Sequence, residues 1–363
     1  MAQPLLEVKD LRVQFDTEDG VVRAVDGVSY TVERGRSLGI VGESGSGKSV
    51  SSLAVMGLTR FQSARVTGEV IFDGRNLLTL SDDEIRRIRG REIAMIFQDP
   101  LSSLHPFYRV GDQLAEAVRA HNDVSKAKAR ERAVDLLGMV GIPEPKRRVD
   151  AYPHEFSGGM RQRAMIAMAL INDPKLLIAD EPTTALDVTV QAQILDLIQR
   201  LKTETDAAVI MITHDLGVVA EVTDEIAEMY AGRVIERAST DAIFDAPQHP
   251  YTWGLLRSIP RLDLPRDVPL VPIEGRPPSL INRPSGCAFH PRCPFVREAH
   301  KHVDPDLVPV EGDRDHLVAC LLTPETRRRL WERLRAGADP AEAREAVPLH
   351  SSEHSVPLES KEA

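Results

Sequence analysis

The chain has no long apolar run, and this absence limits how it can relate to a membrane. Among 363 residues, of which 42% are hydrophobic and 28% charged, no stretch approaches the roughly 18 apolar residues that a spanning helix needs. The balance is typical of a soluble globular protein, and the length suits about two domains with a sizeable core. Any role at a membrane is therefore expected to come through partner chains.

The N-terminus and the charge balance argue against two further classes of protein. Residues Met1 to Pro4 lack the basic and then apolar pattern of a secretory signal, which predicts a cytoplasmic protein. The 45 Lys and Arg against 55 Asp and Glu give a formal net charge of −10, which argues against bulk electrostatic binding to nucleic acid or anionic lipid. No internal repeat is visible.

Cysteine is scarce, and all three cysteines, Cys287, Cys293 and Cys320, lie in the last quarter of the chain. In a cytoplasmic protein such a cluster favours a metal site over a disulfide. His300 lies among them, and a histidine nitrogen can ligate iron or zinc. His290 and His302 are nearby substitutes. Iron, zinc and the absence of any metal all remain open at this point.

The stretch from Ile40 to Ser49 predicts a buried strand, a glycine-rich turn and the start of a helix. Its glycines let backbone N–H groups face inward, and the helix N-terminus adds partial positive charge, so the turn suits a phosphate. Lys48 would neutralise the β and γ phosphates, and Ser49 would hold Mg²⁺. The alternative is a glycine-rich connection without a ligand. The predicted ATP-binding residues here are Gly42, Ser44, Gly45, Ser46, Gly47, Lys48, Ser49 and Val50.

Polar side chains end three strands predicted to be buried. The strand at 175–182 ends in Asp180 and Glu181, the strand at 208–213 is followed by His214, and the strand at 93–97 is followed by Gln98. Open α/β sheets bind ligands at such strand ends. Asp180 would complete the Mg²⁺ shell, and Glu181 could accept a proton from the attacking water. Taken alone, such residues are more often helix caps, solvated turn residues or structural side chains.

Two further positions suit a nucleotide. Ser157 precedes Gly158 and Gly159 at a predicted helix start, where each glycine costs roughly 1 kcal/mol relative to alanine. Close approach of the backbone to an anion would explain the glycines, and a flexible helix start is the alternative. Phe15 lies upstream of the glycine-rich turn and could stack on a base, or it could belong to the core.

Periodicity and turn residues outline the rest of the chain. Further strands are predicted at 6–15, 21–32, 37–41 and 68–72, and helices at 50–58, 111–139, 157–170, 190–202 and 323–336. Ser125 is a predicted N-cap, and Ser81 to Glu84 resembles a capping box that starts another helix.

In this order the motifs resemble those of the nucleotide-binding subunits of ABC transporters, over about Leu5 to Phe244. The signature departs from the usual Leu-Ser-Gly-Gly-Gln at Phe156 and Met160 but keeps its serine and both glycines. The matching motifs are Walker A at 42–49, the Q-loop at Gln98, the signature at 156–160, Walker B at 176–180 followed by Glu181, the D-loop at 185–187 and the switch histidine His214.

The resemblance implies an α/β P-loop NTPase fold with a RecA-like core, an antiparallel β subdomain and an α-helical signature subdomain at about 99–172. It implies an ATPase in which two such domains sandwich two ATP molecules head to tail. Gln98 and His214 would assist Glu181 and also contact ATP, and Mg²⁺ would be held by Ser49, Gln98 and Asp180. The residues implied to complete a site on the second ATPase subunit are Ser157, Gly158, Gly159 and Asp187.

The segment from Gln98 to Pro106 resembles the importer branch for oligopeptides, dipeptides and nickel, and His249 to Pro260 looks like the extension of its peptide-importer ATPases. That branch implies two permease subunits, an extracytoplasmic peptide-binding protein, a place at the cytoplasmic face of the membrane and no nucleic acid. It also implies a [4Fe–4S] cluster, here on Cys287, Cys293, His300 and Cys320. A nickel or other small-solute importer, or less plausibly a soluble ABC ATPase, is the alternative.

The expected domains are a nucleotide-binding domain at 1–245, an extension with the Cys/His motif at 246–330 and a flexible tail at 331–363. The proline-rich stretch Pro265 to Pro284 is expected to be an extended linker laid along a surface.

Overall fold

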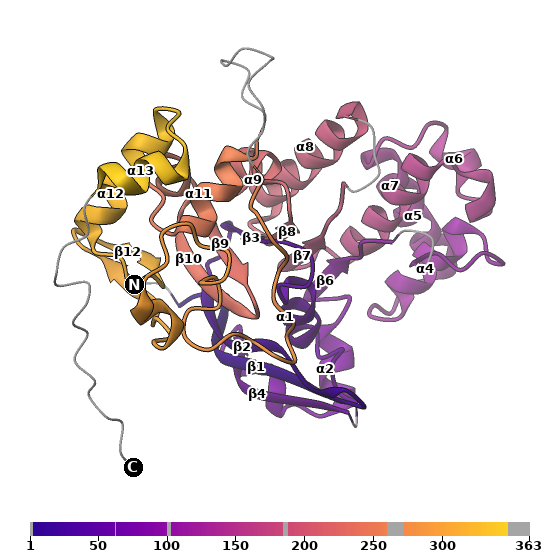
Figure 1. The fold of residues 1–363 in the computed structure, drawn as a ribbon. Helices are drawn as coiled ribbons and strands as arrows, with labels where there is room; N and C mark the ends of the chain where they lie inside the picture. Colours follow the sequence, from indigo (N-terminus) through magenta and orange to yellow (C-terminus); the bar gives the residue numbers. More distant parts are fainter. Residues whose placement is uncertain (1–2, 62, 100–102, 184–187, 260–271, 348–363) are drawn as a thin grey trace.

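The computed structural model describes residues 3–61, 63–99, 103–183, 188–259 and 272–347. Its centre is an eight-stranded sheet in the order β11-β12-β10-β9-β3-β8-β7-β6, and a four-stranded sheet in the order β2-β1-β4-β5 lies beside it (Figure 1). Both sheets and the flanking helices confirm the expected α/β class. No helix in the described ranges is long and apolar enough to cross a membrane.

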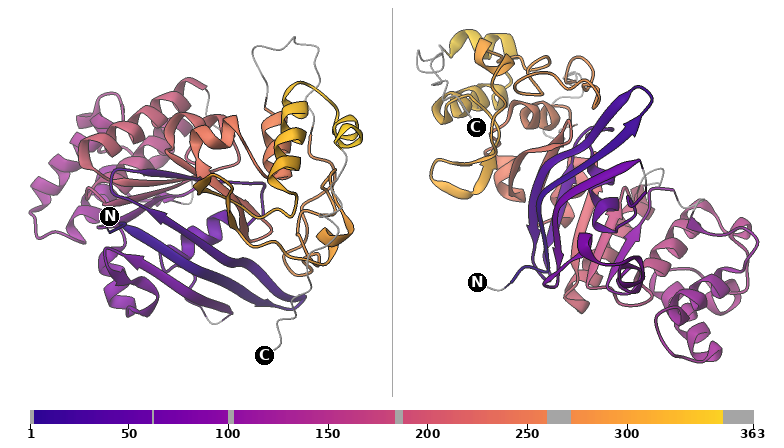
Figure 2. Two further views of the ribbon diagram at one scale, coloured as in Figure 1. Left: turned by 90° about the vertical axis from the view of Figure 1, so that its left-hand side faces the viewer. Right: turned by 90° about the horizontal axis from the view of Figure 1, so that it is seen from below.

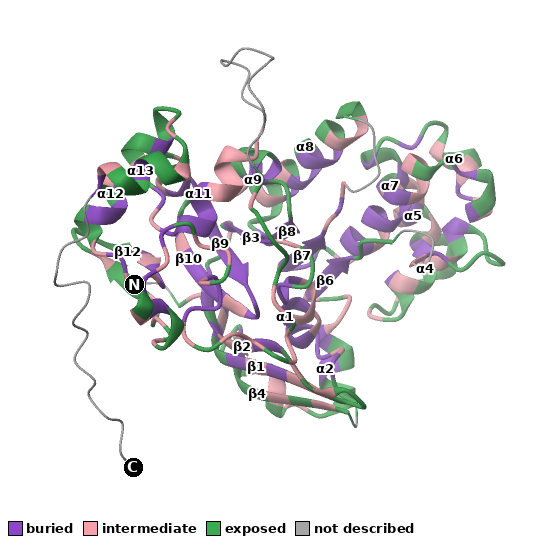
Figure 3. Ribbon diagram, viewed as in Figure 1, coloured by how far each residue is buried: buried purple, intermediate pink, exposed green. Residues whose placement is uncertain are grey.

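The middle of the large sheet is parallel and largely apolar. Strands β9 (Glu225–Tyr230), β3 (Ser37–Val41), β8 (Ala208–Thr213), β7 (Leu176–Asp180) and β6 (Ile93–Ile96) pair in parallel. Every residue of β3, β7, β8 and β6 is buried (Figure 3), because helices cover one face of these strands and the four-stranded sheet with two further helices covers the other. Their carboxyl ends therefore meet at one edge, where the polar residues predicted from the sequence follow.

The small sheet is antiparallel. It contains β1 (Leu6–Thr17), β2 (Gly20–Val32), β4 (Ala64–Phe72) and β5 (Arg75–Asn76). Its inner face joins the core beside α1 (Lys48–Val55) and α2 (Asp82–Ile88). The capping box at Ser81 is confirmed: the Glu84 N–H donates to the Ser81 hydroxyl, and the Ser81 N–H donates to the Glu84 carboxylate. The 3-10 helix η1 (Leu77–Thr79) connects β5 to α2.

A helical region packs against the β6 end of the large sheet. It contains α4 (Val110–Arg119), α5 (Lys126–Met139), α6 (Pro145–Arg148), η2 (Pro153–Glu155) and α7 (Gly158–Leu170), and it shares a core with α8 (Val188–Thr205). The stretch predicted to be helical at 111–139, with Ser125 as an N-cap inside it, forms two helices. Asn122 ends the first by donating its side-chain amide to the Val118 carbonyl, and Ser125 caps the second.

The C-terminal extension joins the large sheet. After α9 (Leu216–Val222), β10 (Arg233–Ser239) and α10 (Thr240–Asp245), the chain forms α11 (Pro250–Arg257), η3 (Glu298–Lys301), β11 (Val308–Val310) and β12 (Asp313–Val318). Strand β12 pairs with β10, so the extension continues the same sheet. Residues around Leu280 lie beside β2, where the Arg23 N–H donates to the Leu280 carbonyl at 3.1 Å (Figure 2).

The tail predicted from residue 331 is wrong for its first part. Helix α12 (Pro324–Arg335) continues to Arg335, and α13 (Pro340–Ala346) packs Ala343 and Val347 against the same apolar cluster as Trp253 and Phe295. Burial of this small face outweighs the polar, proline-interrupted pattern that favoured fraying. Residues 348–363 lie outside the described ranges, as do 265–271 of the proline-rich stretch.

Candidate active site

The glycine-rich turn connects β3 to α1 as predicted, and two of its glycines have no room for a side chain. Gly42 has φ +152°, and a Cβ there would lie 2.2 Å from the Met229 carbonyl oxygen. Gly47 has φ +102°, and its Cβ would lie 2.2 Å from the Ala24 carbonyl oxygen. No side chain caps the N-terminus of α1, so its backbone N–H groups face the turn as anion donors.

Lys48 folds back over this turn. Its Nζ donates to the Gly42 carbonyl at 2.6 Å and to the Glu43 carbonyl at 3.0 Å. Burial lowers the pKa of Lys48, and the carboxylates of Glu181, Asp180 and Glu43 partly oppose this shift. The ammonium group is thus held beside the anion-binding turn by carbonyl groups that a phosphate can replace.

Ser49 and Asp180 bring two oxygen ligands together. The Ser49 hydroxyl donates to Asp180 Oδ1 at 3.1 Å, which joins the start of α1 to the end of β7. Burial raises the pKa of Asp180, the Ser49 hydrogen bond and Lys48 lower it, and Glu181 raises it further. A hard divalent cation prefers such oxygen ligands, so the pair suits Mg²⁺.

Glu181 stands at the centre of the strand ends. Its Oε2 accepts a hydrogen bond from Gln98 Nε2 at 2.9 Å, and its Oε1 lies 3.2 Å from His214 Nδ1. Its backbone has φ +47°, and its N–H donates to the Ile212 carbonyl at 2.8 Å, which turns the chain sharply at the end of β7. Residues from β6, β7 and β8 therefore converge on one carboxylate.

The signature residues lie elsewhere in the chain. Ser157 caps α7 by accepting a hydrogen bond from the Met160 N–H at 3.3 Å. Ser157 and Gly158 are exposed, and a Cβ at Gly158 would meet nothing within 4 Å. Figure 1 shows α7 in the helical region, to one side of α1. Asp187 and the rest of the D-loop lie outside the described residues.

Phe15 lies in β1, where it stacks on Phe61 with ring centroids 5.8 Å apart. It also packs against the core of the small sheet, so its predicted contact with a base stays a prediction. The other predicted residues of the turn differ in how far they are buried. Ser44 and Gly45 are exposed, Ser46 is buried and Val50 is half-buried.

Three residues that were not predicted as site residues meet at the turn. The Glu43 N–H donates to the Tyr251 hydroxyl at 2.9 Å, and the Glu43 carboxylate pairs with the Arg292 guanidinium. Tyr251 and Arg292 do lie in two stretches that the sequence singled out, 249–260 and 287–294. Nothing local relates either stretch to residue 43, so no sequence pattern could have identified the contact.

The predicted metal site on the cysteines and His300 is not supported. Among the residues that the structure describes, no three His, Cys, Asp or Glu side chains are grouped so that they could hold a metal ion. His300 lies in the 3-10 helix η3, and its Nδ1 accepts a hydrogen bond from the Arg297 N–H at 2.8 Å. His290 Nδ1 lies 3.0 Å from the Cys287 carbonyl oxygen, and His302 Nε2 lies 3.2 Å from Glu298.

The cysteines themselves are free thiols in an apolar setting. Burial raises the pKa of Cys320 to about 12 and raises that of Cys293, so both thiols are neutral in the metal-free protein. With no such group of possible ligands among the described residues, the structure does not support the [4Fe–4S] cluster or the zinc site that was expected.

Comparisons with known proteins agree with this geometry. The family described as ABC transporter matches residues 25–184, and the family described as oligopeptide/dipeptide transporter, C-terminal region, matches residues 235–299. The chain is similar to the solved dimeric structure of the bacterial ABC transporter cassette MJ0796. That match has a TM-score of 0.59 at 29% identity and covers 65% of this chain and 98% of that one.

Three curated relatives are similar over most of their length. The oligopeptide transport ATP-binding protein OppD of Bacillus subtilis is 51% identical over 88% of this chain and 90% of that protein. The dipeptide transport ATP-binding protein DppD of the same organism is 55% identical over 80% and 87%, and OppD of Escherichia coli is 53% identical over 82% and 88%. With the P-loop fold and the converging strand ends, these relatives show that the chain is an ATPase of the ABC transporter family, in the branch of the oligopeptide and dipeptide transport ATP-binding proteins.

Proposed function

We propose that this chain powers uptake of oligopeptides or dipeptides by hydrolysing ATP beneath a membrane permease. One observation carries the hydrolytic part: the Glu181 carboxylate lies between Gln98 and His214, at the edge of the sheet that also holds Lys48 and Asp180. The names of the relatives support the peptide substrate, because each is a peptide transport ATP-binding protein.

The turn from Gly42 to Ser49 binds the phosphates. Backbone N–H groups of the turn and of the first turn of α1 donate to phosphate oxygens. Lys48 exchanges its two backbone carbonyl partners for oxygens of the β and γ phosphates, which carry full negative charge. Burial of the ammonium group strengthens this attraction, because the local dielectric constant is low.

Mg²⁺ fits beside Ser49 and Asp180, with Gln98 as the further ligand proposed from the family pattern. When bound, Mg²⁺ would neutralise charge that develops on the phosphate oxygens. Asp180 contributes a carboxylate oxygen fixed by the Ser49 hydroxyl, so the two ligands are already oriented toward each other.

Glu181 acts as the general base. Its carboxylate accepts a proton from a water molecule while the water oxygen attacks the γ phosphorus, and the bond from that phosphorus to the β–γ bridging oxygen breaks. The products are ADP and phosphate. His214 contacts the γ phosphate. His214 and Gln98 also bind the two oxygens of the Glu181 carboxylate, one each, and so fix the orientation of this carboxylate.

The signature residues complete the site of a second ATPase subunit. Ser157, Gly158 and Gly159 are placed at the exposed start of α7, away from the turn of their own chain. A helix start that presents N–H groups and no bulky side chain suits the γ phosphate bound to a partner. Asp187 is proposed to join this contact. The second subunit can be a copy of this chain or a homologue.

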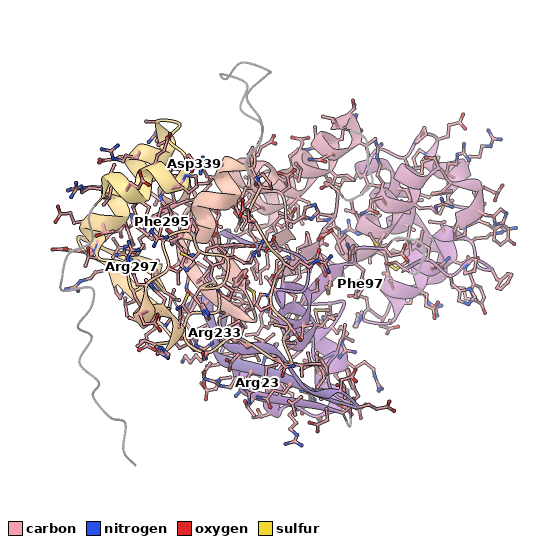
Figure 4. The ribbon with its side chains drawn as sticks, in the orientation of Figure 1. Arg23, Phe97, Arg233, Phe295, Arg297 and Asp339 are labelled. Atoms are coloured by element: carbon pink, nitrogen blue, oxygen red, sulfur yellow. The ribbon has the colours of Figure 1, made fainter. Side chains whose placement is uncertain are left out.

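The surface after Gln98 docks on the permease. Phe107 is 82% exposed and Tyr108 is 59% exposed, and both rings approach His105, at centroid distances of 5.9 and 4.7 Å. Phe97, also exposed, lies where β6 leaves the sheet toward the helical region (Figure 4). Large exposed apolar side chains of this kind mark interaction sites. The ATPase would thereby sit at the cytoplasmic face of the membrane, next to its permease subunits.

A Glu181→Gln variant tests the hydrolytic part. We expect ATP binding to remain and turnover to fall by about 10²-fold or more, the scale of a lost general base. Binding and phosphate release are measured on the purified chain with Mg²⁺, and Glu298→Gln, in the extension, serves as a control of equal charge change. Near-normal turnover in Glu181→Gln would remove Glu181 from the role of base.

The transport part is tested with the assembled importer. Membranes that carry the ATPase, its permease subunits and its binding protein should accumulate labelled peptide only with ATP, and Glu181→Gln should abolish the uptake. Uptake of nickel ion but not of peptide would reassign the substrate. Recovery of the chain with ribosomes or DNA in place of permease subunits would reject transport.

A further inference from the structure

Glu43 is the one residue of the described phosphate-binding turn whose side chain and backbone N–H both bind the C-terminal extension. Its carboxylate accepts from Arg292 Nη1 at 2.5 Å and from Arg292 Nη2 at 3.0 Å, a bidentate pair. Its N–H donates to the Tyr251 hydroxyl. Arg292 and Tyr251 are separated from Glu43 by more than two hundred residues in the sequence, so this contact is purely tertiary.

Arg292 is itself held rigidly. Its Nε donates to the Glu274 carbonyl at 2.9 Å and Nη2 donates to the Ile273 carbonyl at 3.3 Å. The guanidinium also lies 5.9 Å from the ring centroid of Tyr230, at the end of β9. The Arg292 side chain is only 4% exposed and the Glu43 side chain 30% exposed, so solvent screens this pair less than a pair on the open surface. Because these contacts fix the planar Arg292 guanidinium, it also fixes the orientation of the Glu43 carboxylate that it binds.

Tyr251 fixes the backbone of Glu43 through its hydroxyl, which accepts a hydrogen bond from the Glu43 N–H. It is fully buried in α11, and its ring packs against Tyr230 and Phe289 at centroid distances of 4.9 and 5.5 Å. These aromatic contacts leave the hydroxyl no freedom to follow the turn if the turn moves. The Glu43 N–H is therefore held at a fixed point, just after Gly42, which has no room for a side chain beside the Met229 carbonyl.

The chain of contacts ends at Lys48. The carbonyl of Glu43 is one of the two backbone acceptors of Lys48 Nζ, at 3.0 Å. A shift of Glu43 would move this acceptor, together with the N–H groups that follow it in the turn. Among the described residues, the hydrogen bonds between the extension and the phosphate-binding turn go to Glu43.

We propose that Arg292 and Tyr251 are positioning residues for ATP binding, which hold the phosphate-binding turn in its binding conformation through Glu43. The C-terminal extension is then a working part of the nucleotide site, in addition to any role in assembly. This inference rests on the proposed function of Lys48 and the turn. A merely structural contact would stabilise the fold without altering nucleotide affinity.

The same extension offers a matched control. Arg283 also ties it to the ATPase body, because its guanidinium donates to Asp26 at 3.0 Å and to Asp304 at 3.1 Å. Its side chain is largely buried like that of Arg292, yet Asp26 lies in β2 and not in the phosphate-binding turn. An Arg283→Met variant removes a comparable ion pair without touching Glu43.

A double-mutant cycle tests the proposal on the purified full chain. Affinity for a fluorescent ATP analogue with Mg²⁺ is measured for wild type, Glu43→Gln, Arg292→Met and the double variant, with Arg283→Met and Lys48→Ala alongside. We expect Arg292→Met to weaken binding about tenfold, which corresponds to 1.4 kcal/mol, and to raise KM for ATP with kcat nearly unchanged. The double variant should bind no worse than the weaker single variant, because both act through one contact.

The outcomes distinguish the positioning role of Arg292 from the role of Lys48 and the turn in ATP binding. Losses that add in the double variant, or equal losses in Arg292→Met and Arg283→Met, would show that Arg292 only stabilises the extension and would overturn the inference. Wild-type affinity in Lys48→Ala would instead overturn the proposed function of the turn. Thermal unfolding of each variant shows whether it folds, and Glu43→Gln, which leaves the extension intact, tests the contact if Arg292→Met does not fold.

Discussion

Replacement of Glu228 by glutamine should stabilise this protein, and increasingly so as the pH rises. Glu228 and Glu236 are both 0% exposed, and the Thr252 hydroxyl lies 2.6 Å from Glu228 Oε2 and 2.5 Å from Glu236 Oε2. One hydroxyl proton cannot serve two carboxylates. Glu236 has other donors, the backbone N–H groups of Gln248 and His249, and lies 2.7 Å from His316 Nε2. Glu228 Oε1 has no hydrogen-bond partner within the described residues, so Glu228 is the member that carries a proton.

The direction in which stability changes with pH follows from the protonation of Glu228 in the folded and unfolded chains. Burial, reinforced by the charge of Glu236, raises the pKa of Glu228 well above its usual range, and the Thr252 hydrogen bond opposes this only in part. The folded protein therefore holds a proton that the unfolded chain releases above its ordinary pKa. Stability is fully present below that ordinary pKa and falls as the pH rises toward the folded-state pKa, by about 1.4 kcal/mol per pH unit.

Glutamine has the shape of the protonated acid and does not titrate, so Glu228→Gln removes this loss. Between pH 5.5 and 8.5 its advantage over wild type should grow by up to about 4 kcal/mol, if the folded-state pKa lies above that range. Chemical unfolding at several pH values measures the difference. Glu236→Gln is the matched control and should destabilise at every pH, because an amide cannot accept from all the donors that Glu236 serves. An advantage of Glu228→Gln that did not change with pH would refute the assignment of the proton.

Three further substitutions test separate parts of the structure. Gly42→Ala should reduce ATP affinity by more than about tenfold in a nucleotide-binding assay, because its Cβ would lie 2.2 Å from the Met229 carbonyl oxygen; unchanged affinity would show that the turn tolerates the shift. Ser125→Ala should lower the free energy of unfolding by about 1 kcal/mol and leave ATP turnover unchanged, since Ser125 only caps α5; Ser125→Gly should cost less. Phe107→Ala combined with Tyr108→Ala should keep basal ATPase activity and lose recovery with the permease subunits in detergent, and normal recovery would exclude these rings from the docking surface.

Much of the fold could be predicted from the sequence because its signals are local. The strands at 37–41 and 208–213 were predicted with the observed bounds, since continuous apolar runs that end in glycine or polar residues have few other uses. The caps at Ser81, Ser125 and Ser157 were likewise visible, because a cap joins residues only three positions apart. Ser125 marked the start of α5, but the end of α4 was not predicted because apolar spacing in helical register continues on both sides of it.

Within the candidate site, residue types and motif order indicated Lys48, Ser49, Asp180, Glu181, Gln98 and His214, but not their mutual contacts. The parallel order of β6, β7 and β8 is what brings Gln98 and His214 to opposite oxygens of Glu181. The expected metal site is not supported by the structure. Cysteines and histidines close in sequence suggested a cluster, but no three possible ligands are grouped among the described residues, and His300 accepts a hydrogen bond from the Arg297 N–H.

The sequence by itself determined the elements and their chemistry: which stretches form strands or helices, where glycine is required, and which side chains carry charge at the strand ends. Only the tertiary structure decided that the C-terminal extension continues the ATPase sheet through β12 and holds Glu43 through Arg292 and Tyr251. The physical reason is range. Propensity, periodicity and capping act within a few residues along the chain, whereas strand pairing and a buried ion pair depend on which distant surfaces meet, and no local pattern records that.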